Sequence, residues 1–309
     1  MSFPPYPPSD FEPFWRETYA EAEEAVLDWD IGDQVHLGEL GPGQMAAGVI
    51  SRAHVITTFN FRGMDGSRLN GWIAKPLEFD GDLPAFLWLQ PYGRESVLPN
   101  QYGTRPGFIS LSFNYFGEGP FHREKYTPAR GYFADGIEHP GTWRFRSMFQ
   151  DAVLAVRLLR SMEGVDRDRI GSMGMSQGGG ISIWLGAWCP MIRSVCADMP
   201  FLGALHETLM GAIYRYPLKE LQDWAGDDEE KRNQVLRTIS YFDTLNQASF
   251  CHKPTLVSVG AKDPAVKAPQ VQSIYEALPW PKKYIEYPGG HDWHPEMVEY
   301  NQAWLENTT

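Results

Sequence analysis

The feature that most constrains the fold of this chain is an alternation of short apolar runs with helical stretches, which begins near residue 84. Residues 85–89 read Ala-Phe-Leu-Trp-Leu, and residues 108–113 are nearly as apolar. Continuous runs of this length are typical of strands that are buried on both faces, as in a parallel sheet. Because helical stretches follow such strands, we predict an α/β fold with a doubly wound, mostly parallel sheet.

Apolar periodicity and turn signals give the bounds of the expected elements. Strands are expected over residues 54–61, 69–74, 85–89, 108–113, 170–173, 194–197, 255–259 and 284–287, and helices over 10–27, 144–162, 177–188, 268–278 and 293–306. The first two strands form a hairpin, Asp10 caps the first helix, and the glycine-rich residues 30–52 are expected to be irregular. Residues 201–250 show helical stretches without a strand, so we expect one domain over residues 1–309 with 201–250 as a helical insertion.

Charge and composition exclude several classes of partner. The chain of 309 residues has 27 Lys and Arg against 39 Asp and Glu, a formal net charge of −12, which on average repels nucleic acid and anionic membrane surfaces. No apolar run approaches the ~18 residues of a spanning helix, and no secretory signal is visible at the start. The three cysteines have no Cys-x-x-Cys spacing, which indicates a reducing, cytoplasmic location and no structural zinc.

The most informative local motif is Gly174-Met175-Ser176-Gln177-Gly178. It follows an expected strand and opens an expected helix, which is the context that a G-x-S-x-G nucleophile elbow requires. Such a turn exposes the serine hydroxyl and lets the strand and the helix approach closely through the flanking glycines. The alternative is a chance match in a glycine-rich turn. The strand–serine–helix context favours Ser176 as a nucleophile.

A serine nucleophile needs a base, which in proteins with this elbow comes last in the order serine, acid, histidine. His291 follows the last expected strand and its Pro-Gly-Gly turn, so it belongs at the carboxyl end of a strand, where ligands bind in open α/β sheets. His206 and His252 come too early in the chain for this order. We expect His294 to start the last helix and to face solvent.

The acid is expected to be Asp263, which follows the strand over residues 255–259. The alternative is a turn residue, because Asp-Pro pairs favour turns. Two rival acids, Asp292 and Glu296, lie so close to His291 in sequence that reaching its Nδ1 is awkward. A metal site made of His291, Asp292, His294 and Glu296 is a further alternative, but these residues lie in a loop that already fits a triad, so no metal or other cofactor is expected.

Acyl transfer also needs two N–H donors that stabilise the oxyanion. One is expected from Gln177, the residue after the nucleophile. The other is expected from the loop Gln90-Pro91-Tyr92-Gly93, which follows the strand over residues 85–89. Since Pro91 has no N–H, Tyr92 is the natural donor.

Several motifs resemble one known family, the acetyl xylan esterase and cephalosporin C deacetylase group (carbohydrate esterase family seven). The similar stretches span nearly the whole chain: Pro8-Ser9-Asp10-Phe11-Glu12-Pro13-Phe14-Trp15, Gly131-Tyr132-Phe133-Ala134-Asp135-Gly136-Ile137, residues 144–153, Gly174-Met175-Ser176-Gln177-Gly178-Gly179, Asp198-Met199-Pro200-Phe201-Leu202 and Tyr241-Phe242-Asp243. The Ser-Gln-Gly-Gly form of the elbow is more specific than the bare pattern. The resemblance implies the α/β-hydrolase fold, a serine esterase that removes acetyl groups from sugars, and a homo-oligomer in the form of a hexameric ring. It also implies a backbone oxyanion hole at Tyr92 and Gln177.

The sequence departs from the family pattern near the expected site. The family's Arg-Gly-Gln is Phe116-Gly117-Glu118 here, and its His-Gly-Tyr is Gln90-Pro91-Tyr92. The family's final His-Glu becomes His291-Asp292. An apolar ring therefore replaces a guanidinium group, which bears on loop bracing, assembly and substrate preference.

We therefore expect a metal-independent esterase that hydrolyses small acyl esters, chiefly acetyl esters of sugars or xylo-oligosaccharides, through Ser176, His291 and Asp263. The alternative enzyme is a hydrolase of this fold that acts on a lactone, a larger ester or a peptide. A non-catalytic protein that only keeps the fold is the other class, and the intact triad disfavours it. Trp293 is expected either to bind substrate as a wall of the acyl pocket or only to anchor the last helix.

Overall fold

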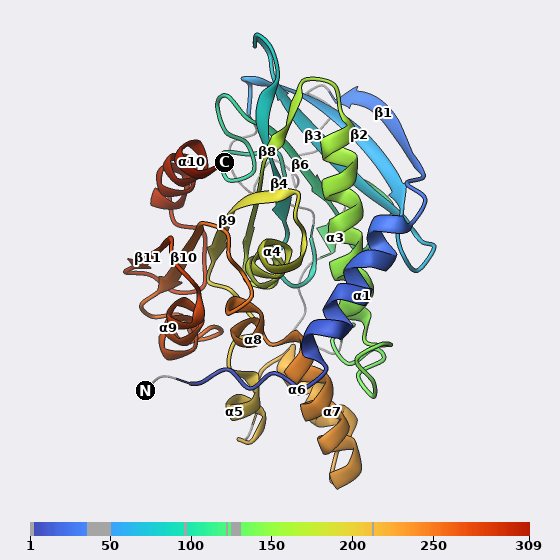
Figure 1. Ribbon diagram of the computed structural model, residues 1–309, viewed down its shortest axis with the longest axis vertical. Coiled ribbons are helices and arrows are strands. Elements are labelled where there is room, and N and C mark those ends of the chain that lie inside the picture. Colours follow the sequence, from blue (N-terminus) through green and yellow to red (C-terminus); the bar gives the residue numbers. More distant parts are fainter. Residues whose placement is uncertain (1–2, 36–50, 96–97, 122, 125–130, 212) are drawn as a thin grey trace.

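A nine-stranded sheet organises the chain in the computed structural model, which describes all residues except 1–2, 36–50, 96–97, 122, 125–130 and 212 (Figure 1). The strands of this sheet are β1 (Trp29–Val35), β2 (His54–Arg62), β3 (Arg68–Pro76), β4 (Leu83–Leu89), β6 (Ile109–Phe113), β8 (Val165–Met175), β9 (Ile192–Asp198), β10 (Thr255–Gly260) and β11 (Lys282–Tyr287). Two short strands, β5 (Arg94–Glu95) and β7 (Arg123–Glu124), pair separately. The helices are α1 (Phe11–Glu24), α3 (Arg144–Ser161), α4 (Gln177–Trp188), α5 (Leu205–Leu209), α6 (Leu218–Ala225), α7 (Glu229–Phe242), α8 (Thr244–Ala248), α9 (Ala268–Ala277) and α10 (Glu296–Thr308).

The strand order is β1-β2-β3-β6-β4-β8-β9-β10-β11. The pairings β1–β2, β2–β3 and β3–β6 are antiparallel, and all pairings from β6 to β11 are parallel. The predicted hairpin and the predicted, mostly parallel doubly wound sheet are both confirmed. Because parallel strands all end at the same edge of the sheet, the loops after β4, β8, β10 and β11 meet there.

Both faces of strand β4 are buried, which explains why apolar and polar residues do not alternate in its sequence. Its side chains Ala85, Leu87 and Leu89 belong to the large core on one side of the sheet, together with residues of α1, α3, α4 and α9. Its side chains Phe86 and Trp88 belong to a second core on the other face, which Leu305 of α10 also enters. Full burial of each large apolar side chain contributes about 1.5–3 kcal/mol, so both faces favour an apolar run.

Three expectations need correction. Residues 30–52 were expected to be irregular, but Trp29–Val35 forms strand β1, while residues 36–50 lie outside the described residues. Most side chains of β1 are exposed, so its sequence carries no apolar signal. The first helix ends at Glu24 rather than at residue 27. Asp10 occupies the N-cap position of α1 but makes no side-chain cap, because its carboxylate accepts a hydrogen bond from the Tyr241 hydroxyl.

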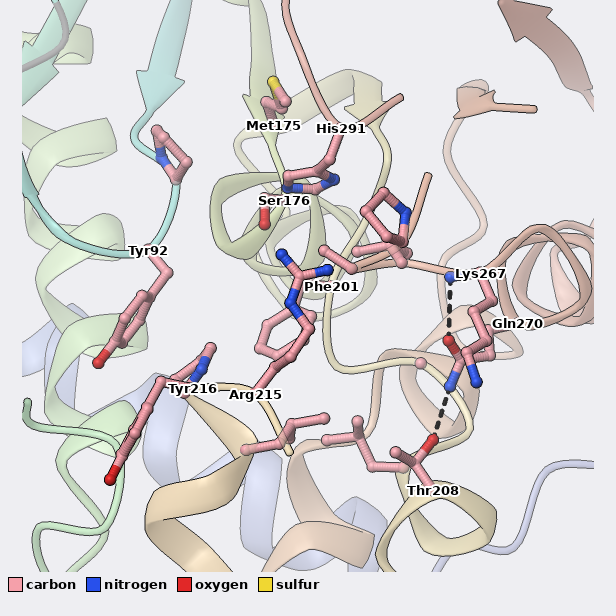
Figure 2. A pocket seen from close by; sticks show the side chains of 18 of the residues that line it. Tyr92, Met175, Ser176, Phe201, Thr208, Arg215, Tyr216, Lys267, Gln270 and His291 are labelled. Atoms are coloured by element: carbon pink, nitrogen blue, oxygen red, sulfur yellow. Dashed lines mark hydrogen bonds between the residues drawn. The ribbon is translucent and has the colours of Figure 1, made fainter. Parts of the chain in front are cut away.

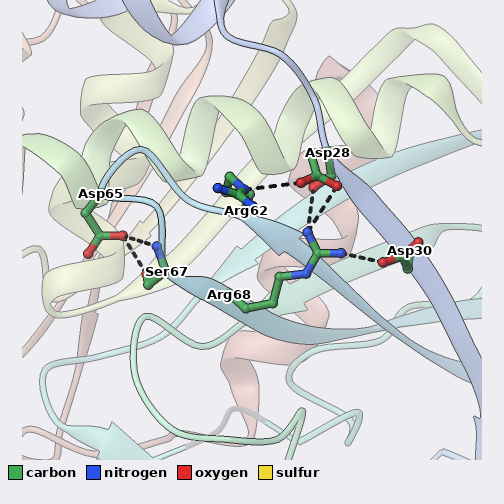
Figure 3. A network of polar contacts seen from close by, with 6 residues as sticks. All are labelled: Asp28, Asp30, Arg62, Asp65, Ser67 and Arg68. Atoms are coloured by element: carbon green, nitrogen blue, oxygen red, sulfur yellow. Dashed lines mark hydrogen bonds and ion pairs between the residues drawn. The ribbon is translucent and has the colours of Figure 1, made fainter.

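An ion-pair network joins strand β1 to the hairpin of β2 and β3 at the edge of the sheet (Figure 3). Arg62 Nε lies 3.2 Å from Asp28 Oδ2, and Arg68 Nη1 lies 3.1 Å from Asp28 Oδ1. Arg68 also pairs with Asp30. These side chains are largely exposed, so each pair contributes at most about 1 kcal/mol. The network fixes the pairing of a polar edge strand more than it stabilises the whole fold.

Helices α5 to α8 follow β9 and precede β10, and they lie together at the lower end of the molecule in Figure 1. This is the stretch for which the sequence predicted helices and no strand. A buried carboxylate, Asp243, organises it by accepting hydrogen bonds from the backbone N–H groups of Ala204, Leu205 and Leu245. Among the described residues, no helix combines the length and the apolar character that a bilayer crossing needs.

Candidate active site

Ser176 occupies a sharp turn between the end of β8 at Met175 and the start of α4 at Gln177. Its backbone has φ 57° and ψ −118°, a conformation that a residue with a side chain rarely adopts. Surrounding hydrogen bonds hold this conformation: the Ser176 N–H donates to the Asp198 carbonyl (2.8 Å), and the Ser176 carbonyl accepts from the Phe201 N–H (2.9 Å). A strained, tightly held residue of this kind points to function.

The glycines of the motif are required by the space around the turn. A Cβ added to Gly174 would collide with the backbone of Gly178. A Cβ added to Gly178 would collide with the carbonyl group of Leu89, at the end of the neighbouring strand β4. The motif is therefore a structural requirement of the turn, and not a chance match in a glycine-rich loop.

Asp263 and His291 meet at the edge of the sheet where β10 and β11 end. His291 Nδ1 lies 2.6 Å from Asp263 Oδ2. The other carboxylate oxygen, Oδ1, accepts hydrogen bonds from the N–H groups of Ala265 (2.7 Å) and Val266 (2.9 Å). The Asp263 side chain is fully buried. Because Nδ1 is engaged by a fixed carboxylate, the remaining ring nitrogen of His291, Nε2, is available for chemistry.

Ser176 and His291 line the same cavity, and Figure 2 shows the His291 ring next to the Ser176 side chain. The cavity has a volume of about 540 Å³. One wall comes from the loops after β4, β8, β10 and β11, and the other from residues of the α5 and α6 region, such as Leu205 and Tyr216. The structure thus brings Ser176, His291 and Asp263 together at one edge of the sheet.

The other candidate histidine and acid make different contacts. The His294 ring stacks on Tyr287, with centroids 4.9 Å apart and an interplanar angle of 14°, and His294 is half-buried. The expectation that it starts the last helix and faces solvent was therefore wrong, because α10 begins at Glu296 and Tyr287 gives the His294 ring a partner. Asp292 is exposed, and its Oδ1 accepts the N–H of Trp293. Within the described ranges, no group of three or more His, Cys, Asp or Glu side chains is arranged to hold a metal ion.

Of the two predicted oxyanion donors, Gln177 directly follows the nucleophile and Tyr92 lines the same cavity. Gln177 is the first residue of α4, so its N–H has no acceptor within the helix. Its buried side chain is held through Oε1, which accepts the Tyr132 hydroxyl at 2.9 Å. Tyr92 lies in the loop after β4 and lines the cavity beside Ser176.

Glu220 is a buried residue at this site that the sequence analysis missed. Its Oε1 accepts hydrogen bonds from the Tyr92 hydroxyl (2.9 Å) and the Gly131 N–H (2.6 Å). Its Oε2 accepts from the N–H groups of Phe133 (3.0 Å) and Ala134 (3.4 Å). This carboxylate of α6 therefore ties the helical segment to the Tyr92 loop. No spacing or motif marks it in the sequence, because its partners are remote in the chain.

Phe116, which replaces an arginine of the family motif, packs against Tyr132, in the segment whose backbone N–H groups bind Glu220. Its ring centroid lies 4.3 Å from that of Tyr132. The guanidinium carbon of Arg144 lies 5.2 Å from the Phe116 centroid, so a cation–π contact is formed on the ring. Arg144 in turn pairs with Asp65. An aromatic ring that is tilted against Tyr132 and has a guanidinium beside it thus occupies the place where the family pattern has a guanidinium fork.

Trp293 makes contacts that fit both alternatives left open by the sequence, a wall of the acyl pocket and an anchor of the last helix. It lines the cavity beside His291 and Asp292. It also packs against Trp88 and Tyr102, with ring centroids 5.7 and 5.0 Å away. A substitution of Trp293 therefore has to be judged by both its packing and its place at the cavity.

The sheet order, the turn that carries Ser176 and the position of the Asp263–His291 pair define a protein with the α/β-hydrolase fold. The model of the acetyl xylan esterase (AXE1) family matches residues 4–307, and the chain belongs to this family of carboxylic ester hydrolases.

Similar proteins share the sequence only distantly and the fold closely. The acetyl esterase Axe7A of Xylanibacter ruminicola is 21% identical over 248 residues, which are 76% of this chain and 55% of that protein. This chain thus spans little more than half the length of that relative. The structure of the acetyl xylan esterase from Paenibacillus sp. R4 has a TM-score of 0.84 and 24% identity, covering 100% of this chain and 97% of that one. Acetyl xylan esterase 1 from Thermoanaerobacterium has a TM-score of 0.78 and 21% identity, with coverages of 99% and 95%.

Proposed function

We propose that this protein is a serine esterase that removes acetyl groups from acetylated sugars, including acetylated xylo-oligosaccharides, without a metal or other cofactor. The observation that carries the proposal is the 2.6 Å hydrogen bond between His291 Nδ1 and Asp263 Oδ2, in a pair whose histidine shares a cavity with Ser176. Membership of the acetyl xylan esterase family supports an acetyl ester as the substrate.

In the first half of the proposed reaction, the Ser176 hydroxyl attacks the carbonyl carbon of the acetyl ester while His291 Nε2 takes its proton. Asp263 keeps the imidazole oriented and stabilises the imidazolium. The negative charge on the carbonyl oxygen is stabilised by the backbone N–H groups of Tyr92 and Gln177. When the carbon–oxygen bond to the sugar breaks, His291 donates the proton to the leaving alkoxide, which leaves an acetyl group on Ser176.

In the second half, a water molecule attacks the acetyl-enzyme and gives one proton to His291 Nε2. The bond between Ser176 Oγ and the acetyl carbon then breaks, the serine regains the proton, and acetic acid leaves. Each turnover consumes one ester and one water and produces one alcohol and one acetic acid. No oxidant, reductant or metal is needed.

Aromatic side chains at the cavity support a carbohydrate substrate. Tyr214 and Tyr216 both line it, and Tyr214 is 84% exposed. A ring of this type offers an apolar face to the C–H groups of a sugar and a hydroxyl for its polar groups. Trp293 is proposed to form the wall on the acyl side.

The arrangement of the chain beyond the site is also part of the proposal. We propose that residues 1–309 form one domain in which residues 201–250 are a helical insertion that covers the active site. A homo-oligomer, in the form of a hexamer, and a cytoplasmic location are proposed from the family resemblance and from the sparse cysteines. Cys189, Cys196 and Cys251 are all free and buried, which is consistent with a reducing location.

The function is tested by the release of acetate from acetylated xylo-oligosaccharides and of nitrophenol from p-nitrophenyl acetate. Ser176→Ala is expected to lower kcat by on the order of 10⁴-fold or more. The matched control is Ser161→Ala, which removes an exposed hydroxyl from α3. A fluorophosphonate probe should label the wild type once per chain and leave Ser176→Ala unlabelled. Wild-type activity in Ser176→Ala, or loss of activity with EDTA and its recovery with zinc, would contradict the proposal.

A further inference from the structure

Arg215 reaches into the proposed active site from the helical segment that covers it. It belongs to residues 213–218, which lead from α5 into the start of α6 and all line the cavity. In Figure 2 its side chain extends from this segment toward Ser176 and His291. The guanidinium group therefore faces the region where a substrate has to lie for attack by Ser176.

The Arg215 side chain forms no ion pair or hydrogen bond with any residue that the structure describes. Its neighbours differ in this respect: Lys219 pairs with Asp223, and the Tyr216 hydroxyl donates to the same carboxylate at 3.0 Å. A guanidinium group presents five N–H donors in a planar fork that matches a carboxylate. At Arg215 these donors are directed into a cavity and not used by the fold.

The charge of the cavity is opposite to that of the whole chain. Among its lining residues, the groups charged at neutral pH are the cations Arg215 and Lys267 and the single carboxylate of Asp292. One oxygen of Asp292 already accepts the N–H of Trp293. The chain as a whole carries a formal charge of −12. A site with two cations in such an acidic protein attracts an anion to a place that the rest of the surface disfavours.

We propose that Arg215, assisted by Lys267, binds a carboxylate of the substrate, so that the preferred esters are acetylated acidic sugars or other esters that carry a carboxylate close to the scissile bond. Arg215 forms the paired hydrogen bonds to the carboxylate, and Lys267, at the start of α9, adds a second positive charge to the cavity lining. This inference rests on the proposed esterase function and specifies the chemical class of its substrate. The carboxylate belongs either to the alcohol part or to the acyl part of the ester.

The test compares esters that differ only in the carboxylate. On the alcohol side the pair is 4-acetoxybenzoate and its methyl ester, and on the acyl side it is 4-nitrophenyl hydrogen glutarate and its methyl ester. For each pair, the ratio of kcat/KM for the charged ester to kcat/KM for the neutral ester is measured. The pair whose ratio depends on Arg215 identifies the part of the substrate that holds the carboxylate.

The ratio is compared among the wild type and three variants, each with an expected result. Arg215→Met should lower the ratio at least tenfold for one pair, because a charge-assisted, two-pronged contact is lost. Arg215→Lys keeps the charge but not the fork, so its ratio should lie between those of the wild type and Arg215→Met. The control is Arg167→Met, which removes an exposed arginine near the start of β8, at the opposite end of the strand from Ser176. Its ratio should equal that of the wild type, although Arg167→Met removes one positive charge just as Arg215→Met does.

A ratio that is the same in the wild type, Arg215→Met and Arg167→Met for both pairs would overturn the inference. If the wild type hydrolyses none of the four esters, the esterase proposal fails instead. The carboxylate site is then still decided by direct binding of 4-acetoxybenzoate to Ser176→Ala, with and without Arg215→Met. Weaker binding in the double variant supports the site, and unchanged binding overturns it.

Discussion

Asp263 and His291, which are 28 residues apart in the chain, are joined by a 2.6 Å hydrogen bond between Oδ2 and Nδ1. The second oxygen of the same carboxylate is held by two backbone N–H groups of the turn that follows it, from Ala265 and Val266. The carboxylate is therefore oriented before it meets the imidazole. An orienting acid of this kind sets the tautomer of the ring and leaves Nε2 directed to the nucleophile.

Asp263→Asn should lower kcat on p-nitrophenyl acetate by on the order of 10³–10⁴-fold while the fold is retained. The amide can keep the contact to Nδ1, but it favours the wrong tautomer and cannot stabilise the imidazolium. The matched control is Asp80→Asn, which neutralises an exposed carboxylate remote from β10 and β11 and should retain wild-type kinetics. A loss of less than about tenfold in Asp263→Asn would assign the orienting role to another acid.

Glu220→Gln should lower both stability and activity, because four donors converge on this buried carboxylate. An amide offers one oxygen in place of two, so two of the donors would face an NH₂ group. Each buried donor left unsatisfied costs about 1–3 kcal/mol. Thermal unfolding should report the loss of stability, and steady-state kinetics should show kcat falling more than KM changes, since the Tyr92 loop loses its anchor.

Two further variants separate positioning from general destabilisation. Tyr92→Phe removes the hydroxyl donor to Glu220 but no backbone N–H, so it should show a smaller part of the same kcat effect. Glu229→Gln, at the exposed first position of α7, should leave both stability and kcat unchanged. If Glu220→Gln lowers stability with wild-type kcat at a temperature where it is folded, Glu220 is structural only.

The part of the site that the sequence predicts is the part that the sheet dictates. Ser176 and Asp263 each follow an apolar run closely, and His291 follows a short strand with aromatic residues and a Pro-Gly-Gly turn; parallel strands recognised in this way end at one edge. The order of strands and helices in the sequence therefore predicts both the catalytic role of these residues and their position at this edge of the sheet. Strand β1 escaped recognition because its exposed side chains have no apolar pattern.

Glu220 and Arg215 show what remains beyond the reach of sequence. Both lie in the helical segment, where a charged residue on a helix or in a loop normally faces water. Whether such a residue is buried under four donors, as Glu220 is, or directed into a cavity, as Arg215 is, depends on how the segment packs against the sheet. That packing involves contacts between residues far apart in the chain, which no local spacing encodes.

The stability of the protein should depend on pH through Asp151, a buried residue of α3. Burial raises the pKa of Asp151 to about 7 from the ordinary value of 3.8, although its Oδ1 accepts the Met64 N–H at 2.7 Å. Between these two values the folded chain keeps the proton while the unfolded chain releases it. The free energy of unfolding should therefore fall as pH rises from about 4 to about 7.

Asp151→Asn tests this dependence, because the amide oxygen can keep the bond to Met64 and has no proton to lose. Urea unfolding at pH 5 and pH 8 should show the variant gaining stability relative to the wild type as pH rises. Asp80→Asn again serves as the control and should show no such trend. An identical pH dependence in Asp151→Asn and the wild type would contradict the assignment to Asp151.

Acetyl esters should be cleaved faster than butyryl or longer esters, because Trp293 and Tyr92 both line the cavity. Forcing a longer acyl chain into a filled site costs about 1–3 kcal/mol, which corresponds to roughly 5- to 150-fold in kcat/KM. A wild type that prefers octanoyl to acetyl esters would contradict both the small pocket and the deacetylase proposal.

Trp293→Ala should shift this preference toward longer chains and also destabilise the protein, since the ring packs against Trp88 and Tyr102. The loss should stay below the ~3–5 kcal/mol typical of a fully buried tryptophan, because Trp293 is only half-buried. The matched control is Trp304→Ala, whose ring packs on the same core but does not line the cavity. It should lose stability and keep the wild-type order of p-nitrophenyl acetate over butyrate and octanoate. If Trp293→Ala keeps that order with unchanged ratios, Trp293 is an anchor of the last helix and the acyl wall lies elsewhere in the cavity.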